Sequence, residues 1–148
     1  MHMGEKKQPS RFATDAVHSG TQHIGDAVNT PIFQSSTYKL TDERYAGWAA
    51  GAQHTLLYAR LSSVNSDAVA QKLTALEQGE DAETFASGMA AISTTLMALL
   101  NQGDHMVASA DVYGGTYGLL TEEFPRFGIS TTMADMRDAA SYEAAIQE

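Results

Sequence analysis

Three short stretches of the sequence carry groups that could bind a flat, anionic ligand. The first contains Ser87, Gly88 and Met89, directly after a short apolar run that ends near Phe85. Glycine lets a ligand approach the backbone, and the free amides and dipole at a helix N-terminus favour a phosphate. The Ser87 hydroxyl could add a hydrogen bond. Taken alone, these residues also fit an ordinary serine N-cap followed by a closely packed glycine.

The second stretch places Tyr113 directly before Gly114 and Gly115. It follows a predicted strand, and ligands of open parallel sheets bind where strands end and helices begin. A tyrosine at this position could stack on a planar ring, because a flat aromatic side chain presents a large apolar face. It could equally pack over the edge of the sheet.

The third stretch is Tyr58-Ala59-Arg60. In an extended segment, residues two apart project to the same side, so the phenol and the guanidinium could converge on one anion. Arginine matches phosphate oxygens with two parallel hydrogen bonds, and tyrosine adds another donor. The same pair also occurs on protein surfaces without any such role.

The elements that must position these residues follow from the apolar periodicity after Ser66. Ser66 is predicted to cap a helix whose buried stripe is Val69, Leu73 and Leu76, and Gly79 is predicted to end it.

Beyond Gly79 the pattern alternates between strands and helices, which predicts a mostly parallel α/β sheet. The second helix has Ile92, Leu96 and Leu99 on one face, and Pro125 interrupts or ends the third. We expect the last helix to be cut off by the chain end. The predicted strands are 82–85, 105–109 and 129–133, and the predicted helices are 88–102, 113–127 and 138–148.

The region before Ser66 shows no sustained helical period. Residues 1–10 are predicted to be a tail or cloning remnant, and residues 11–65 an ordered arm that packs on something else. Aromatic side chains favour an ordered arm over a solvated linker. They are Phe33, Tyr38, Tyr45, Trp48 and Tyr58. Residues 66–148 would then be the first, incomplete part of a larger domain.

The composition excludes several classes of protein. The 148 residues carry 18 acidic and 9 basic side chains, a net charge of −9, which argues against nucleic acid and anionic membrane surfaces as partners. There is no cysteine, so disulfides, thiolate nucleophiles and cysteine-bound zinc are excluded. No apolar run is long enough for a membrane span or a signal peptide. We expect a cytoplasmic protein.

The order and spacing of six stretches resemble a known family. The sequence is similar, over nearly its whole length, to the N-terminal part of the trans-sulfuration enzymes that depend on pyridoxal 5′-phosphate (PLP). These include cystathionine γ-synthase, cystathionine γ- and β-lyases, methionine γ-lyase and O-acetylhomoserine sulfhydrylase. The matching stretches are residues 16–22, 30–38, 58–60, 76–77, 86–91 and 111–116.

The resemblance implies a fold-type-I PLP-dependent transferase-like architecture: an N-terminal arm and the first half of a mostly parallel α/β large domain. It implies that Ser87, Gly88 and Met89 bind the cofactor phosphate. Tyr113 would stack on the pyridine ring and assist proton transfer at the substrate amine. Tyr58 and Arg60 would reach the phosphate of a neighbouring subunit, in a homotetramer built from two tight dimers.

The sequence departs from the family pattern in three places. The family's Asn-Pro-Thr is replaced by Ser63-Val64-Asn65, which we expect to change the helix entry but not the phosphate contacts. Gly115 stands where methionine γ-lyases typically carry a cysteine, which argues modestly against that branch. The lysine that binds the cofactor covalently, and the aspartate paired with the pyridine nitrogen, lie downstream of the matching region.

None of the available lysines has the setting that the family's reactive lysine requires. Lys6 and Lys7 lie in the tail, Lys72 is expected to face solvent, and Lys39 does not follow a strand. This chain alone is therefore expected to be inactive, because the lysine anchors the cofactor and moves protons.

The resemblance implies γ-elimination or γ-replacement on a sulfur amino-acid substrate such as cystathionine or an O-acylhomoserine. The first alternative is a truncated, non-catalytic subunit or scaffold with the PLP fold. The second is a dinucleotide-binding α/β domain, with Gly114, Gly115 and Gly118 after a strand and Asp135 about twenty residues on, although the glycine spacing does not match. The histidines at 18, 23, 54 and 105 show no metal-ligand spacing.

Overall fold

In a computed structural model the chain forms two units: one of helices and loops, and one that also contains strands. The structure describes residues 12–51 and 55–146, and the units are residues 1–84 and 85–148. The predicted tail, His54 and the last two residues of the predicted final helix lie outside the described residues. In the described part of the chain, the longest apolar helix is too short to cross a bilayer.

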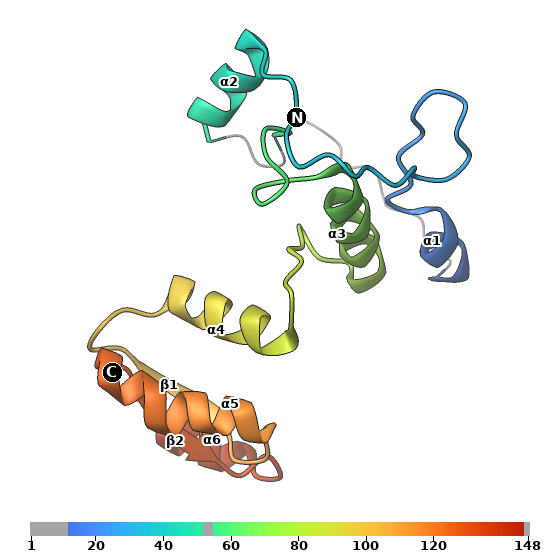
Figure 1. Cartoon of the computed structure of the whole chain (residues 1–148). Helices are drawn as coiled ribbons and strands as arrows, with labels where there is room; N and C mark the ends of the chain where they lie inside the picture. The colour runs from blue at the N-terminus through green and yellow to red at the C-terminus, as the bar shows by residue number, and fades with distance from the viewer. Residues whose placement is uncertain (1–11, 52–54, 147–148) are drawn as a thin grey trace, which may run out of the picture. The chain divides into compact units, whose positions relative to one another are not determined.

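The described residues of the first unit form three helices, α1 (Phe12–His18), α2 (Asp42–Ala49) and α3 (Val64–Glu77), shown in blue to green in Figure 1. Two of them, α1 and α2, lie in the region where the sequence shows no sustained helical period. These helices have seven and eight residues, so an apolar stripe has too few turns to become visible in the sequence. Thr41 caps α2 by accepting a hydrogen bond from the Arg44 amide.

Helix α3 begins three residues earlier than predicted. Ser63, not Ser66, is its N-cap: the Ser63 hydroxyl accepts from the Ser66 amide at 3.1 Å, and the Ser66 hydroxyl accepts from the Ser63 amide at 3.1 Å. This is a reciprocal capping box in which serine replaces the usual glutamate. At the other end the left-handed residue is Gln78, with φ of 56°, and Gly79 follows it.

The predicted buried stripe of α3 is also wrong. Its buried residues are Val64 and Ala70, whereas Val69 and Leu73 are 50% and 42% exposed. The arm covers the neighbouring face instead, because Gly20 lies directly against the α3 backbone at Ala68. Periodicity identifies an apolar face but not the segment that covers it.

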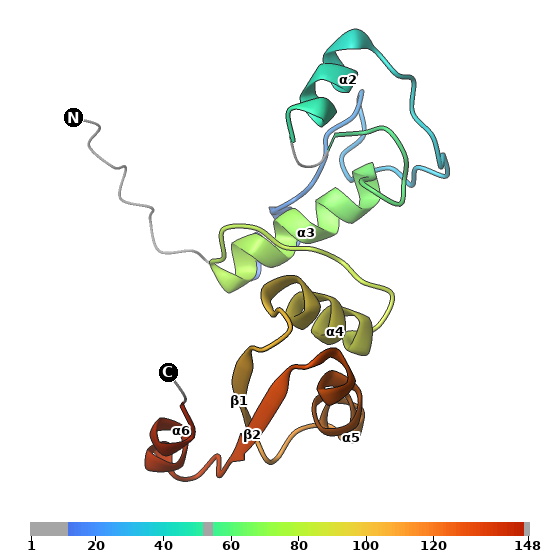
Figure 2. The ribbon, with the colours of Figure 1, turned by 90° about the vertical axis from the view of Figure 1, so that its left-hand side faces the viewer.

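The second unit places two parallel strands among short helices (Figures 1 and 2). In chain order its elements are α4 (Gly88–Leu99), β1 (His105–Ser109), α5 (Gly114–Gly118), the π-helix η1 (Leu119–Glu123), the 3₁₀-helix η2 (Phe124–Phe127), β2 (Ser130–Ala134) and α6 (Ala139–Ala145). Strands β1 and β2 pair in register from His105 with Ser130 to Ser109 with Ala134. The prediction of a parallel α/β arrangement is confirmed.

Two details differ from the predicted elements. Residues 82–85 form no strand, because no described strand pairs with them. The predicted helix 113–127 is a continuous helical run of three kinds. Pro125 explains the change, because in a continued α-helix its ring would clash with the carbonyl four residues earlier, and the wider π-turn avoids that clash.

The core of the second unit lies between the helices and one face of the sheet. Leu120, Phe124 and Ile129 are buried. The partly buried residues packed against them are Leu96, Leu100, Met106, Ala108, Leu119 and Met133. Leu96 of the predicted α4 face therefore packs inward, but Leu99 is 71% exposed. The predicted domain limits, at residues 10 and 65, stay predictions.

Candidate functional site

The N-terminus of α4 presents open backbone amides. Ser87 is its N-cap, and its hydroxyl accepts from the Ala90 amide at 3.1 Å. That hydroxyl can still donate its own proton. The amides of Gly88 and Met89 lie in the first turn, where the helix has no carbonyl that could accept from them. They are therefore available to a ligand or water. A Cβ at Gly88 would meet no atom within 4 Å, so the approach is open.

Tyr113 stands at the start of α5, immediately beyond the carboxyl end of β1. It is the N-cap residue of α5, it makes no side-chain capping bond, and its side chain is 73% exposed. The ring lies back over Gly115: a Cβ there would be 2.7 Å from Tyr113 Cε1. Only glycine leaves this space, so Gly115 permits the observed ring position.

The structure brings the first and second predicted stretches together through the side chain of Met89. The Thr116 hydroxyl donates to Met89 Sδ at 3.6 Å, and a Cβ at Gly115 would be 3.2 Å from the same sulfur. Thr116 is buried. The starts of α4 and α5 therefore lie side by side, and the open amides and the Tyr113 ring belong to one surface of the second unit.

We expect Gly115→Ala to displace the Tyr113 ring. A carbon contact needs about 3.5 Å or more, so the ring must move by about 1 Å or rotate. Crystal structures of the two proteins would measure this displacement. Gly114→Ala is the matched control, because a Cβ at Gly114 meets nothing within 4 Å. An unmoved ring in Gly115→Ala would contradict the packing described above.

The third stretch, Tyr58 and Arg60, lies in the first unit. Tyr58 forms an isolated antiparallel bridge with Thr37, and the chain then turns, with the amides of Leu61 and Ser62 donating to the Tyr58 carbonyl at 2.8 and 3.2 Å. The prediction of an extended segment through Arg60 is therefore wrong, because the turn begins at Tyr58. The two side chains nevertheless meet: Arg60 Cζ lies 5.3 Å from the centroid of the Tyr58 ring.

Arg60 is open to a ligand. It is exposed, and within the described ranges no carboxylate pairs with it. A guanidinium held against an aromatic face keeps its donors free at the edge. The structure thus brings Met89 and Tyr113 together in one unit and Tyr58 and Arg60 together in the other.

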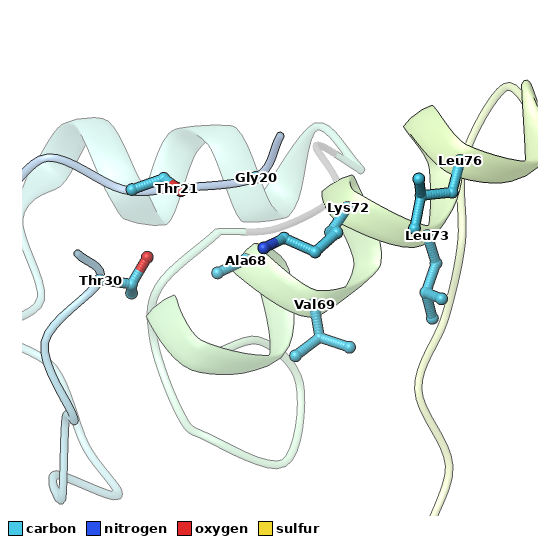
Figure 3. A pocket seen from close by; sticks show the side chains of 8 residues that line it. All are labelled: Gly20, Thr21, Thr30, Ala68, Val69, Lys72, Leu73 and Leu76. Carbon is cyan, nitrogen blue, oxygen red and sulfur yellow. The ribbon is translucent and has the colours of Figure 1, made fainter. Parts of the chain in front are cut away.

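A small apolar pocket lies between the arm and α3 (Figure 3). Its volume is about 230 Å³. It is lined by Gly20, Thr21, Thr30, Ala68, Val69, Lys72, Leu73 and Leu76. The expectation that Lys72 faces solvent is wrong, because Lys72 is half-buried here and its Nζ donates to the Val17 carbonyl at 3.3 Å. A positive charge at this place is favourable, because the C-terminal end of a helix carries a partial negative charge.

Comparisons with known proteins identify the class. The model of the family described as "Cys/Met metabolism PLP-dependent enzyme" matches residues 13–148. The chain therefore belongs to this family of PLP-dependent enzymes. The family assignment decides against the dinucleotide alternative. Asp135, the acidic residue of that alternative, already has partners in this chain. Its carboxylate accepts hydrogen bonds from the Arg137 side chain and amide, which lower its pKa.

Individual relatives agree with this assignment. The chain is 38% identical over 140 residues to the L-methionine γ-lyase of Porphyromonas gingivalis, covering 93% of the chain and 35% of that enzyme. It is 42% identical over 129 residues to the cystathionine γ-lyase of Bacillus subtilis, covering 87% and 32%. Methionine γ-lyases are thus among the relatives, so overall similarity does not support the argument from Gly115.

The fold class is confirmed by a solved structure, a putative O-acetylhomoserine (thiol)-lyase of Campylobacter jejuni. Its TM-score is 0.84 at 30% identity, and the match covers 92% of the chain and 34% of that protein. That structure contains N′-pyridoxyl-lysine-5′-monophosphate. The chain spans about a third of the length of the relatives it matches.

The described residues fit PLP. The α4 amides with their open approach suit its phosphate, and the exposed Tyr113 ring suits the face of its pyridine ring. Arg60 suits a phosphate as well. Sequence reasoning missed two residues that organise these groups, the Met89 side chain and Asn65. No local signal could have identified the Met89 contact. For Asn65 a signal was present, because it lies in the altered Asn-Pro-Thr motif.

Proposed function

We propose that the protein takes part in sulfur amino-acid metabolism as a PLP-dependent enzyme. The reaction is γ-elimination or γ-replacement on cystathionine or an O-acylhomoserine. The observation that carries the proposal is the meeting of the α4 amides and the Tyr113 ring on one surface, in a chain of this family. PLP, when bound, withdraws electrons from the substrate and makes its α-proton acidic.

The residues of this chain would bind and orient. The amides of Gly88 and Met89, with the Ser87 hydroxyl, would hold the cofactor phosphate at the positive end of α4. Tyr113 would cover the ring face, and its exposed phenol would hold or move a proton at the substrate amine. The reaction removes the α-proton and then the β-proton, and the γ-substituent leaves.

Tyr58 and Arg60 are proposed to contact the phosphate of a neighbouring subunit. Their exposure in the first unit supports this role, since an anion can reach both side chains. The protein would then be a homotetramer, a dimer of dimers with shared sites, and we propose that it acts in the cytoplasm. The reactive lysine and the aspartate at the pyridine nitrogen would come from outside this chain, which would be inactive alone.

Visible absorbance of the intact gene product with bound cofactor tests the proposal. We expect protein incubated with PLP to absorb visible light, and we expect borohydride to fix the cofactor covalently, because both follow from a lysine–PLP linkage. Mass spectrometry after borohydride treatment measures the attachment. The enzyme proposal fails if neither occurs, and a non-catalytic subunit with the PLP fold would then be the better description.

A substrate assay separates the two reaction types. A lyase should release a thiol from cystathionine, which a thiol reagent detects. A synthase or sulfhydrylase should instead consume an added thiol in the presence of an O-acylhomoserine.

A further inference from the structure

The Asn65 side chain connects the arm to the start of α3 by two hydrogen bonds. Its side-chain amide donates to the Pro31 carbonyl at 2.8 Å, and its side-chain carbonyl accepts from the Phe33 amide at 2.8 Å. Both bonds join residues more than thirty positions apart. A side chain that donates and accepts at once is needed for this pair of contacts, and Asn provides both groups on one short, rigid plane.

The same arm segment is fastened a second time, next to Tyr58. The Tyr38 amide donates to the Leu57 carbonyl at 3.1 Å, and the Ala59 amide donates to the Ser36 carbonyl at 2.8 Å. The arm from residue 31 to 38 is therefore attached at both ends to the segment 57–65. Together the two segments form a closed loop of hydrogen bonds.

The turn that carries Arg60 lies inside this closed loop. It begins at the bridge of Tyr58 with Thr37 and ends at the Ser63 cap of α3. Without the bonds of Asn65, the arm would be attached at one end only, and the turn would lose one of its two supports. Neither bond involves the ligand-facing groups themselves.

We infer that Asn65 is a positioning residue that holds Tyr58 and Arg60 in place for the cofactor phosphate. The inference rests on the proposed function. In this chain Asn65 stands in the altered Asn-Pro-Thr motif, where proline does not constrain the backbone. The two hydrogen bonds of its amide constrain the helix entry instead.

The test compares two cofactor forms in the intact gene product. Apo protein is titrated with PLP and with pyridoxal, which lacks the phosphate, and binding is followed by cofactor absorbance. We expect Asn65→Ala to raise the dissociation constant of PLP about tenfold and that of pyridoxal by less than about twofold, because two hydrogen bonds that orient charged contacts are lost. A general loss of structure would weaken both.

A second variant guards against misfolding. Asn65→Asp keeps the acceptor for Phe33 and places a negative charge in the first turn of α3, where the helix dipole favours it. It should fold and still lose selectivity for PLP over pyridoxal. Asn29→Asp is the matched control: it makes the same change of charge at an exposed turn of the arm, and it should keep full selectivity.

The outcomes separate this inference from the proposed function. If Arg60→Ala reduces selectivity for PLP but both Asn65 variants leave it unchanged, the inference alone is overturned. It is overturned equally if only Asn65→Asp has an effect, since charge would then be the cause. If Arg60→Ala also leaves selectivity unchanged, the proposed phosphate role fails and the inference fails with it. In the double variant Arg60→Ala/Asn65→Ala the two losses should not multiply.

Discussion

Replacing Arg60 by alanine in the intact gene product is expected to raise the dissociation constant of PLP about 100-fold, while that of pyridoxal changes little. The reason is the loss of two charge-assisted hydrogen bonds to the phosphate, each stronger than a neutral bond. Absorbance titration of apo protein with either cofactor form measures the effect. The exposed position of Arg60 means that the loss should not come from unfolding.

Arg126→Ala is the control for this prediction. Arg126 is also exposed, and it forms a surface ion pair with Glu123 at 2.7 Å, far along the chain from the proposed phosphate contacts. Its replacement should leave both dissociation constants unchanged, because surface ion pairs contribute little. If Arg60→Ala binds PLP with unchanged affinity, Arg60 does not contact the cofactor phosphate.

The second large effect is expected for Gly20→Ala. A Cβ at Gly20 would lie 2.8 Å from the Lys72 amide nitrogen and far closer than any permitted contact to the Ala68 carbonyl oxygen, and the backbone φ is +71°. Left-handed backbone costs about 1 kcal/mol or more for alanine, and overpacking costs about 1–3 kcal/mol. The free energy of local opening of α3 should fall by about 3 kcal/mol.

Hydrogen exchange of the α3 amides measures this free energy. Gly25→Ala is the matched control, since Gly25 also has a positive φ, +59°, but a Cβ there meets nothing within 4 Å. It should show the backbone cost alone, about 1 kcal/mol. Equal effects in the two variants would mean that the contact between Gly20 and α3 contributes nothing.

The sequence predicted those parts of the fold that depend on short-range pattern. The strand 105–109 was predicted with its observed limits, because it is a short apolar run between turn residues. The start of α4 at Gly88 was predicted from its serine cap and glycine. The buried stripe of α3 was not, because Val69 and Leu73 would pack inward only if another segment covered them.

The candidate site divides in the same way. Residue types and order indicated Gly88, Tyr113 and Arg60 as ligand-binding groups. The supports of these groups are long-range contacts, such as Asn65 with Pro31 or Met89 with Thr116. Such contacts depend on which segments become neighbours in space, and periodicity and spacing carry no information about that.

The contact between Met89 and Thr116 has a consequence for mutagenesis. Met89 offers a backbone amide at the start of α4 and, separately, a thioether that packs on α5. An alanine scan removes the thioether and leaves the amide, so it would report only how the two helices pack. The amide's share in anion binding would stay hidden from every side-chain substitution at this position, and replacing the peptide bond by an ester would reveal it.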